Sequence, residues 1–370
     1  MLPHLCFSPD YFRKGKKPVV EDSGQNILVV GATGFLGPAL VEELTLAGFR
    51  VICGVRNLKK AACQLTFSGV QLLQIDLNKD INPEVWLSRL KEYEIDRVVN
   101  NVGIANCFGG QSMENVNVLA PLALFEAAQF YFMDHEFSAT DGATPRVIQI
   151  STTGVDWPDC DKFPYPASKL LLEEQLARLG DLAYIIIRPN VIYEPERGHL
   201  LLEQIAKIPF IFYIGHEQIQ PVHCRELAIG VARILTKKTV LKHTLLRAVG
   251  PTPMTWKEIF EVSSAALGKS HICYCAVPLK LAQIVTMLIQ KLPEKVLSRF
   301  GILSKMDPDT LVMMTRGSTG SNKEWLQATD LRPVRLDETY REYEKGPEVY
   351  AAFIASLRDN SIDRSTRQKG

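Results

Sequence analysis

The chain has 370 residues, with 42 Lys and Arg against 41 Asp and Glu, and hydrophobic residues make up 46% of it. This length allows one large fold or two domains around a sizeable core. The near-zero net charge argues against a protein dedicated to nucleic acid or anionic lipids, because it supplies no long-range field to gather phosphates. No stretch reaches the about 18 uninterrupted apolar residues of a transmembrane helix.

The chain ends and the cysteines predict a cytoplasmic protein, with the mitochondrial or plastid matrix as the alternative. Residues 1–24 lack the apolar core of a secretory signal, and we expect a flexible leader there. Residues 358–370 are polar and mixed in charge, which indicates a disordered tail. The eight cysteines are scattered, so we expect reduced thiols and no metal, although Cys273 and Cys275 would face one side of a strand and could hold one.

The first predicted unit consists of a strand, a glycine turn and a helix. Residues 27–30 are an apolar run, as expected of a strand buried on both faces. The helical pattern that follows ends at Gly48, and a second apolar strand over 51–55 completes a unit of about 30 residues. The turn holds the first candidates for cofactor binding, which are Gly31, Thr33, Gly34, Phe35, Leu36 and Gly37.

The glycines of this turn have the spacing of a dinucleotide-binding site. Gly31 permits the tight turn, Gly34 lets backbone amides approach a pyrophosphate at the helix N-terminus, and Gly37 lets the helix lie close to the sheet. A tight structural turn without a ligand is the alternative.

Residues at the ends of the next two strands indicate which nucleotide is bound. Arg56 follows the second strand, where NAD-preferring proteins carry an acidic residue, and an arginine there suits the 2′-phosphate of NADP. We therefore predict NADP (NADPH) rather than NAD. Asp76 and Leu77 end the strand over 70–75, where an adenine would rest, although Asp76 could simply cap the next turn.

Buried asparagines follow in the middle of the predicted sheet. The strand over 97–102 ends in Asn101 and Val102, and Asn117 lies inside an apolar segment over 116–128. Buried amides need partners, so these asparagines bridge backbones, shape the nicotinamide side of the cleft, or do both.

A strand over 147–150 leads to the predicted chemistry. Thr152 stands at its carboxyl end, and Tyr165 and Lys169 share one face of the helix that comes next. A neighbouring ammonium stabilises a phenolate, so we expect Lys169 to lower the pKa of Tyr165 toward the working range for proton transfer. Thr152 would hold the substrate oxygen against the tyrosine.

Together these motifs resemble the extended and atypical short-chain dehydrogenase/reductases. The resemblance covers roughly residues 25–250 and is specific as a set. It implies that Tyr165 is the catalytic acid/base, that Lys169 is its activator and a ligand of the nicotinamide ribose, and that Thr152 is the hydroxyl partner. Pro189 and Val191 are implied to line the nicotinamide side.

Within that family the chain is most similar to the branch of the NADPH-binding accessory subunit of respiratory complex I and its bacterial relatives. The shared features are a short gap between Thr152 and Tyr165, Asn115-Val116-Asn117-Val118, Gln220-Pro221-Val222-His223 and Gly250-Pro251. Sugar-nucleotide dehydratases carry Asp-Glu after the catalytic threonine, where this chain has Thr153-Gly154, which disfavours dehydration. Epimerases typically have a longer loop before the tyrosine, so a large sugar nucleotide is a less suitable substrate here.

The expected fold is α/β, a Rossmann-type doubly wound parallel sheet over 25–195 with a smaller, mainly helical substrate lobe over 196–357, which could return a strand to the sheet. His223 precedes a helix and is expected to brace it, with substrate contact as the alternative. An apolar helix over 279–291 could cover the core, line a lipophilic pocket, or dock on a membrane or partner. The further helices of the lobe are predicted over 200–207, 225–236, 256–267 and 322–328.

Three functions fit these residues. The first is an NAD(P)-dependent oxidoreductase acting on a carbonyl or alcohol, the second a non-catalytic NADP(H)-binding accessory or assembly protein, and the third a sugar-nucleotide epimerase. The substrate is a small molecule whose identity the sequence does not give, and the oligomeric state stays open. No nucleic-acid partner is expected.

Overall fold

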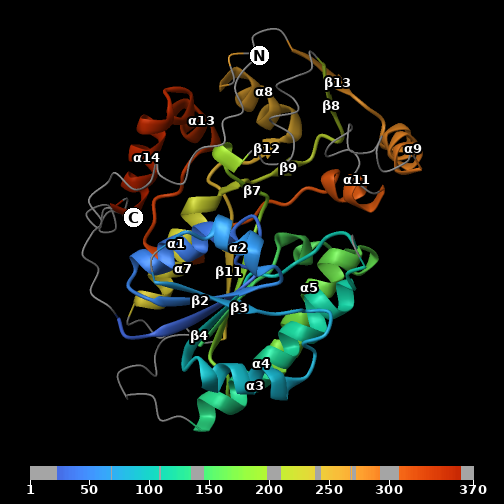
Figure 1. Cartoon of the computed structure of the whole chain (residues 1–370). Coiled ribbons are helices and arrows are strands. Elements are labelled where there is room, and N and C mark those ends of the chain that lie inside the picture. Colours follow the sequence, from blue (N-terminus) through green and yellow to red (C-terminus); the bar gives the residue numbers. More distant parts are fainter. Residues whose placement is uncertain are drawn as a thin grey trace.

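The computed structural model describes residues 23–67, 69–107, 110–134, 146–197, 210–237, 243–266, 268, 272–291 and 308–359. Its centre is a parallel sheet of seven strands in the order β11-β6-β5-β4-β1-β2-β3 (Figure 1). The order reverses between β1 and β4, which makes this a doubly wound Rossmann-type sheet, as predicted. The strands are β1 (Asn26–Val30), β2 (Arg50–Val55), β3 (Val70–Gln74), β4 (Ile95–Asn100), β5 (Val147–Ile150), β6 (Tyr184–Pro189) and β11 (Thr244–Ala248).

Helices cover both faces of the sheet, and the strand residues alternate between the two layers. Ile27 and Val29 of β1 face one layer, whereas Leu28 and Val30 face the other, because successive side chains of a strand point to opposite faces. The first layer contains α1 (Gly37–Leu46), α2 (Leu58–Gln64), α7 (Cys224–Thr236) and α12 (Lys323–Thr329). The second contains α3 (Pro83–Glu92), α4 (Ala120–Asp134) and α5 (Pro164–Arg178).

Local signals in the sequence located the ends of the first elements correctly. Gly48 has φ +90° just beyond α1, a conformation that glycine adopts without strain. Asn82 caps α3 by accepting a hydrogen bond from the Glu84 amide at 2.9 Å. β4 ends at Asn100, so Asn101 and Val102 lie in the loop after the strand and not within it.

The remaining elements form a lobe beyond the carboxyl edge of the sheet, drawn at the top of Figure 1. Its strands pair in three two-stranded sheets: β10–β7, β12–β9 and β13–β8. The strands are β7 (Ile192–Tyr193), β8 (Phe210–Tyr213), β9 (Gln218–Ile219), β10 (Val222–His223), β12 (Met254–Thr255) and β13 (Cys273–Ala276). The helices are α8 (Trp256–Ala266), α9 (Leu279–Gln290), α11 (Pro308–Met314), α13 (Leu336–Glu344) and α14 (Pro347–Asp359).

Residue 195 is not a simple boundary between two domains. α7, α12 and β11 all follow it in sequence, yet they pack into the Rossmann layer or join its sheet. α7, α8, α9 and α12 confirm four predicted helices, whereas α11, α13 and α14 were not predicted. The expected helix over 200–207 and nearly all of the expected leader and tail lie outside the described residues.

α14 continues through Asp359, so Arg358 is helical although the sequence indicated a tail from residue 358. Arg358 donates from Nε to Glu43 Oε2 at 2.8 Å and from Nη2 to Glu43 Oε1 at 2.7 Å, which ties α14 to α1. His223 lies next to this ionic cluster, where its Nε2 is 3.0 Å from Tyr350 Oη. It is fully buried and contacts α14, whereas its side chain makes no capping hydrogen bond to α7, the helix that it was expected to brace.

Two apolar helices need separate comment. Asn115–Met133 is long and apolar enough to span a membrane, but most of it is buried against the sheet, α3 and α5, as in a core helix. α9 is different, because Leu281, Ile284 and Leu288 are 52%, 55% and 59% exposed. α9 therefore covers the small cluster of Ile214 and Leu311 with one side, whereas its other side is apolar and exposed.

Cys273 and Cys275 lie on β13 with their Sγ atoms 3.6 Å apart, so they face one side as predicted. In the described ranges, no group of three or more His, Cys, Asp or Glu residues is arranged to hold a metal ion.

Candidate functional site

The glycine turn between β1 and α1 is built from close backbone contacts. Gly31 has φ +84°, and a Cβ there would lie 2.8 Å from the Asn101 carbonyl oxygen. A Cβ on Gly37 would lie 2.3 Å from the Ala32 carbonyl oxygen, so only glycine lets α1 start this close to the turn. A Cβ on Gly34 would meet little besides the Gly31 carbonyl oxygen, at 3.2 Å. The fold itself therefore needs glycine at positions 31 and 37, whereas Gly34 is less constrained by its neighbours.

The N-terminus of α1 offers backbone donors to an anion. Leu36 occupies the N-cap, and among the described residues no side chain caps the helix there. The first amides of a helix lack partners within the helix and carry its positive dipole end, so they suit a pyrophosphate. The turn residues Thr33 and Phe35 lie at this same entrance. This part of the chain thus fits the dinucleotide that the sequence implied.

The residues expected around the adenine end of the nucleotide lie at the ends of β2 and β3. Arg56 directly follows β2 and is exposed. Asp76 accepts a hydrogen bond from the Asn78 amide at 3.2 Å and lies 3.6 Å from Lys79 Nζ, so it closes the turn after β3. This is the capping role that the sequence left open. Leu77 is partly buried against the layer of α3.

Asn101 and Asn117 hold the loop after β4. Asn101 donates from Nδ2 to the Gly31 carbonyl oxygen at 3.3 Å. Asn117 is fully buried; it accepts from the Ile104 amide and donates to the Ile104 carbonyl oxygen and to Ser168 Oγ, each at 2.9 Å. It lies in a π-helical turn, η2 (Asn115–Leu119), a feature often found at functional sites. Asn117 therefore locks the loop against α5.

Thr152, Tyr165 and Lys169 meet where β5, the loop after β4 and the start of α5 converge. Thr152 and Tyr165 both line a cavity beyond the sheet edge. Lys169 is almost fully buried and donates from Nζ to the Ile150 carbonyl oxygen at 3.0 Å and to that of Val102. The structure thus brings together the three predicted catalytic candidates.

Gly103 is a site residue that the sequence analysis did not single out. A Cβ on it would lie 3.0 Å from both Cε and Nζ of Lys169 and 3.3 Å from Cε2 of Tyr165. Any larger residue would therefore press on both side chains. A glycine in the loop after a central strand was the available signal, but only the three-dimensional contact shows what it accommodates.

Burial dominates the protonation of the pair. It raises the pKa of the Tyr165 phenol to about 12 and lowers the pKa of the Lys169 ammonium to about 8, while the Glu173 carboxylate opposes the second shift. The prediction that Lys169 lowers the pKa of Tyr165 is wrong for this geometry. The ammonium donates to two backbone carbonyls, and the desolvated phenolate is penalised more than it is stabilised.

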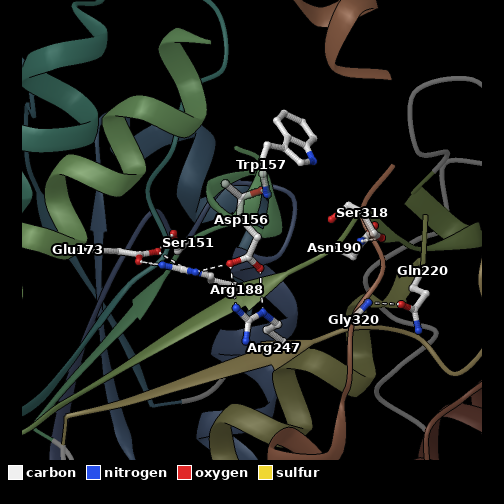
Figure 2. A network of polar contacts seen from close by, with 12 residues as sticks. Ser151, Asp156, Trp157, Glu173, Arg188, Asn190, Gln220, Arg247, Ser318 and Gly320 are labelled. Carbon is white, nitrogen blue, oxygen red and sulfur yellow. Dashed lines mark hydrogen bonds and ion pairs between the residues drawn. The ribbon is translucent and has the colours of Figure 1, made fainter. Parts of the chain in front are cut away.

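A polar network behind the site fixes α5 relative to the strands (Figure 2). Ser151 donates from Oγ to Glu173, and Arg188 Nε lies 3.1 Å from Glu173 Oε1. Asp156 accepts hydrogen bonds from Arg188 and from Arg247, whose Nε lies 2.8 Å from Asp156 Oδ2. Because Ser151 precedes Thr152 and Glu173 lies one helical turn beyond Lys169, the network sets the position of both candidates.

The cavity beside Thr152 and Tyr165 has a volume of about 730 Å³ and lies between the sheet edge and the lobe. Val191 lines it, whereas Pro189 ends β6 just before it. Residues 317–320 are bonded to two segments: Asn190, which follows β6, donates to the Ser318 carbonyl oxygen at 2.7 Å, and the Gly320 amide donates to Oε1 of Gln220, between β9 and β10, at 2.6 Å (Figure 2). These bonds hold the lobe side of the cavity in place.

The chain matches the NAD dependent epimerase/dehydratase family over residues 27–240, more than half of its length, and it belongs to that family. Among curated proteins it is 27% identical over 186 residues to "Protein TIC 62, chloroplastic" of Arabidopsis thaliana, covering 46% of this chain and 28% of that protein. It is 24% identical over 248 residues to "NADH dehydrogenase [ubiquinone] 1 alpha subcomplex subunit 9, mitochondrial" of Dictyostelium discoideum, covering 65% of this chain and 64% of that protein. The chain thus spans less than two thirds of these relatives.

Two solved structures show the same fold. UDP-glucuronic acid 4-epimerase from Bacillus cereus, in complex with UDP-glucuronic acid and NAD, has a TM-score of 0.61 at 18% identity and covers 90% of this chain and 100% of its own. Triphenylmethane reductase from Citrobacter sp., complexed with NADP(H), has a TM-score of 0.60 at 18% identity. The match covers 85% of this chain and 99% of the reductase chain. At this identity the likeness establishes the fold alone.

Proposed function

We propose that the protein is an NADP-dependent oxidoreductase that reduces a carbonyl or oxidises an alcohol, with Tyr165 as the proton donor or acceptor. The observation that carries this proposal is that Thr152 and Tyr165 line the same cavity, while Lys169 is buried one helical turn along α5 from Tyr165. A merely structural cavity has no need of a buried lysine one turn along the helix from a tyrosine. Replacing Tyr165 by Phe keeps the ring and removes the proton.

The chain's own residues would divide the work as follows. Thr152 orients the substrate oxygen, and Tyr165, protonated at neutral pH because its pKa is about 12, donates to it during reduction. Lys169 holds the loop after β4 through its carbonyl contacts and would contribute to binding the nicotinamide ribose. The turn from Gly31 to Gly37 would hold the pyrophosphate, and the bound nicotinamide would supply or accept the hydride.

The test measures nucleotide binding and turnover separately. Tyr165→Phe is expected to bind NADPH within about twofold of wild type and to lose at least about 100-fold in turnover. A variant that turns over a carbonyl substrate at the wild-type rate would refute the role of Tyr165.

The preference for NADP rests on Arg56, which is exposed at the end of β2 where a 2′-phosphate could reach it. Calorimetry with NADPH and NADH on wild type and Arg56→Ala tests it. We expect the variant to lose roughly tenfold in NADPH affinity, about 1.4 kcal/mol, and none for NADH. Equal binding of both nucleotides by wild type would contradict the preference.

A non-catalytic accessory or assembly role is the second candidate. It is favoured by the similarity to a protein named as an alpha subcomplex subunit of NADH dehydrogenase. The exposed apolar side of α9 would then serve association with a protein or membrane surface, since Leu281, Ile284 and Leu288 are more than half exposed. Full biological function of Tyr165→Phe in cells would favour this role over catalysis.

Epimerisation of a sugar nucleotide is the third candidate, favoured by the family and by the fold of the UDP-glucuronic acid 4-epimerase. It predicts NAD that stays bound through purification, which mass spectrometry of the released nucleotide would detect. The compartment is likewise a proposal. The sequence predicted the cytoplasm, but the relatives named as chloroplastic and mitochondrial favour the organellar alternative.

A further inference from the structure

The walls of the 730 Å³ cavity are apolar, aromatic and adaptable. Trp256 and Phe260 reach it from α8, Met313 and Met314 from α11, and Trp157 from the Rossmann side. Methionine side chains are flexible and polarisable, so they fit around ligands of irregular shape. The volume lies within the roughly 300–1,000 Å³ of small-molecule sites.

Charged groups are almost missing from this lining. Among the described residues around the cavity, Arg316 is the single charged side chain. It is already engaged, because its Nη2 donates to Asp159 Oδ2 at 2.6 Å and its guanidinium lies 5.6 Å from the centre of the Phe163 ring. A diphosphate or carboxylate in this cavity would have to break that pair or stay unpaired, and a desolvated, unpaired anion is strongly disfavoured.

Apart from Arg316, the polar side chains that line the cavity are uncharged. They include Thr152, Tyr165, Asn106, Gln111, Thr310 and Ser318. Asn190 also lines the cavity, but its amide is occupied, since Nδ2 donates to the Ser318 carbonyl oxygen and Oδ1 accepts from the Val191 amide, both at 2.7 Å. A lining that is mostly apolar and carries only uncharged polar groups besides the paired Arg316 suits a neutral, largely apolar molecule with a polar oxygen.

We infer that the cavity binds a neutral, largely apolar ketone, aldehyde or alcohol and discriminates against nucleotide sugars and other anions. The inference rests on the proposed oxidoreductase function, whose site it shares, and adds the substrate class. In reduction the carbonyl carbon would gain a hydride from NADPH and the carbonyl oxygen a proton from Tyr165, which leaves an alcohol and NADP⁺. Each added methylene should raise affinity roughly fourfold, because it buries apolar surface.

Two of the four tryptophans make binding visible without turnover. Trp157 and Trp256 line the cavity, whereas Trp86 and Trp325 are fully buried elsewhere. Tryptophan fluorescence of the full chain with NADP⁺ is titrated with 2-hexanone, 2-octanone, 2-decanone, decanoate and UDP-glucose. We expect the ketones to bind more tightly as the chain lengthens, and decanoate and UDP-glucose to bind at least about tenfold more weakly than 2-decanone.

A matched pair of variants localises the signal. Met313→Asp places a charge in the cavity wall at a partly exposed position, and Met287→Asp makes the same change on the exposed side of α9, outside the lining. Met313→Asp should weaken 2-decanone binding at least about tenfold and leave NADPH affinity unchanged, whereas Met287→Asp should change neither.

The outcomes separate this inference from the proposed function. Ketone binding without NADPH consumption supports the apolar selectivity and counts against hydride transfer. Tighter binding of UDP-glucose or decanoate, no binding of any ketone, or ketone affinity that Met313→Asp leaves unchanged would overturn the apolar assignment, whether or not NADPH binds.

Discussion

Glu226 of α7 should make the stability of the protein fall as pH rises. Its side chain is buried, and one carboxyl oxygen accepts from the Val334 amide at 2.9 Å. Burial raises its pKa from 4.5 to about 8. The folded protein therefore keeps this proton between about pH 4.5 and 8, where the unfolded chain has lost it.

The sign and size of the effect follow from linkage. Stability is greatest below the unfolded pKa of 4.5 and is lost as pH rises toward the folded value of about 8. One pKa unit corresponds to about 1.4 kcal/mol, so the group should remove roughly 3 kcal/mol from the free energy of unfolding between pH 4.5 and 7. Lys169 affects the free energy of unfolding only above this pH range, because its pKa falls from 10.5 in the unfolded chain to about 8 in the folded protein.

Glu226→Gln tests this reasoning, since glutamine can still accept from the Val334 amide and does not ionise. Urea unfolding is measured at pH 5, 6, 7 and 8. The free energy of unfolding of the variant, relative to wild type, should rise by about 1 kcal/mol for each pH unit. Glu174→Gln is the control, because Glu174 is exposed on α5. Parallel pH curves for wild type and Glu226→Gln would refute the burial argument.

Two further substitutions probe the site itself. Gly103→Ala would place Cβ 3.0 Å from Lys169 Nζ, so we expect the folded variant to lose roughly tenfold in NADPH affinity. Gly180→Ala is the control, because no atom lies within 4 Å of the added carbon, and it should keep its NADPH affinity. Equal NADPH affinities of the two variants would contradict the effect of the Gly103 contact. Glu173→Gln breaks a buried pair with Arg188, so the free energy of unfolding should fall by about 3 kcal/mol. It also removes the charge that raises the pKa of Lys169, so the pH profile of NADPH binding should move to lower pH. Unchanged stability and profile, matching Glu174→Gln, would count against this role.

The catalytic candidates could be read from the sequence because the relevant patterns are local. Apolar runs mark the buried strands, and the carboxyl ends of parallel strands meet at one edge, which places Gly31, Asn101 and Thr152 near one another. Tyr165 and Lys169 share a helix face at four residues' separation. α13 was missed although Leu336, Thr339 and Tyr340 are buried at helical spacing.

The protonation of the site depended on contacts between distant segments. The Lys169 ammonium meets the Val102 carbonyl oxygen across 67 residues of sequence, and burial among such distant segments shifts the pKa values of both Lys169 and Tyr165. No local pattern predicts where an ammonium points once it is buried. For the same reason, the effect of Gly103 on both side chains emerged only from the folded chain.

The sequence by itself therefore determined the Rossmann sheet, the glycine turn and the identity of the catalytic candidates, because strand burial, turn geometry and helix spacing are properties of neighbouring residues. The tertiary structure alone decided which side chains enclose the cavity. Its walls come from segments as far apart as Gly103 and Tyr340, and packing between such segments depends on the whole fold.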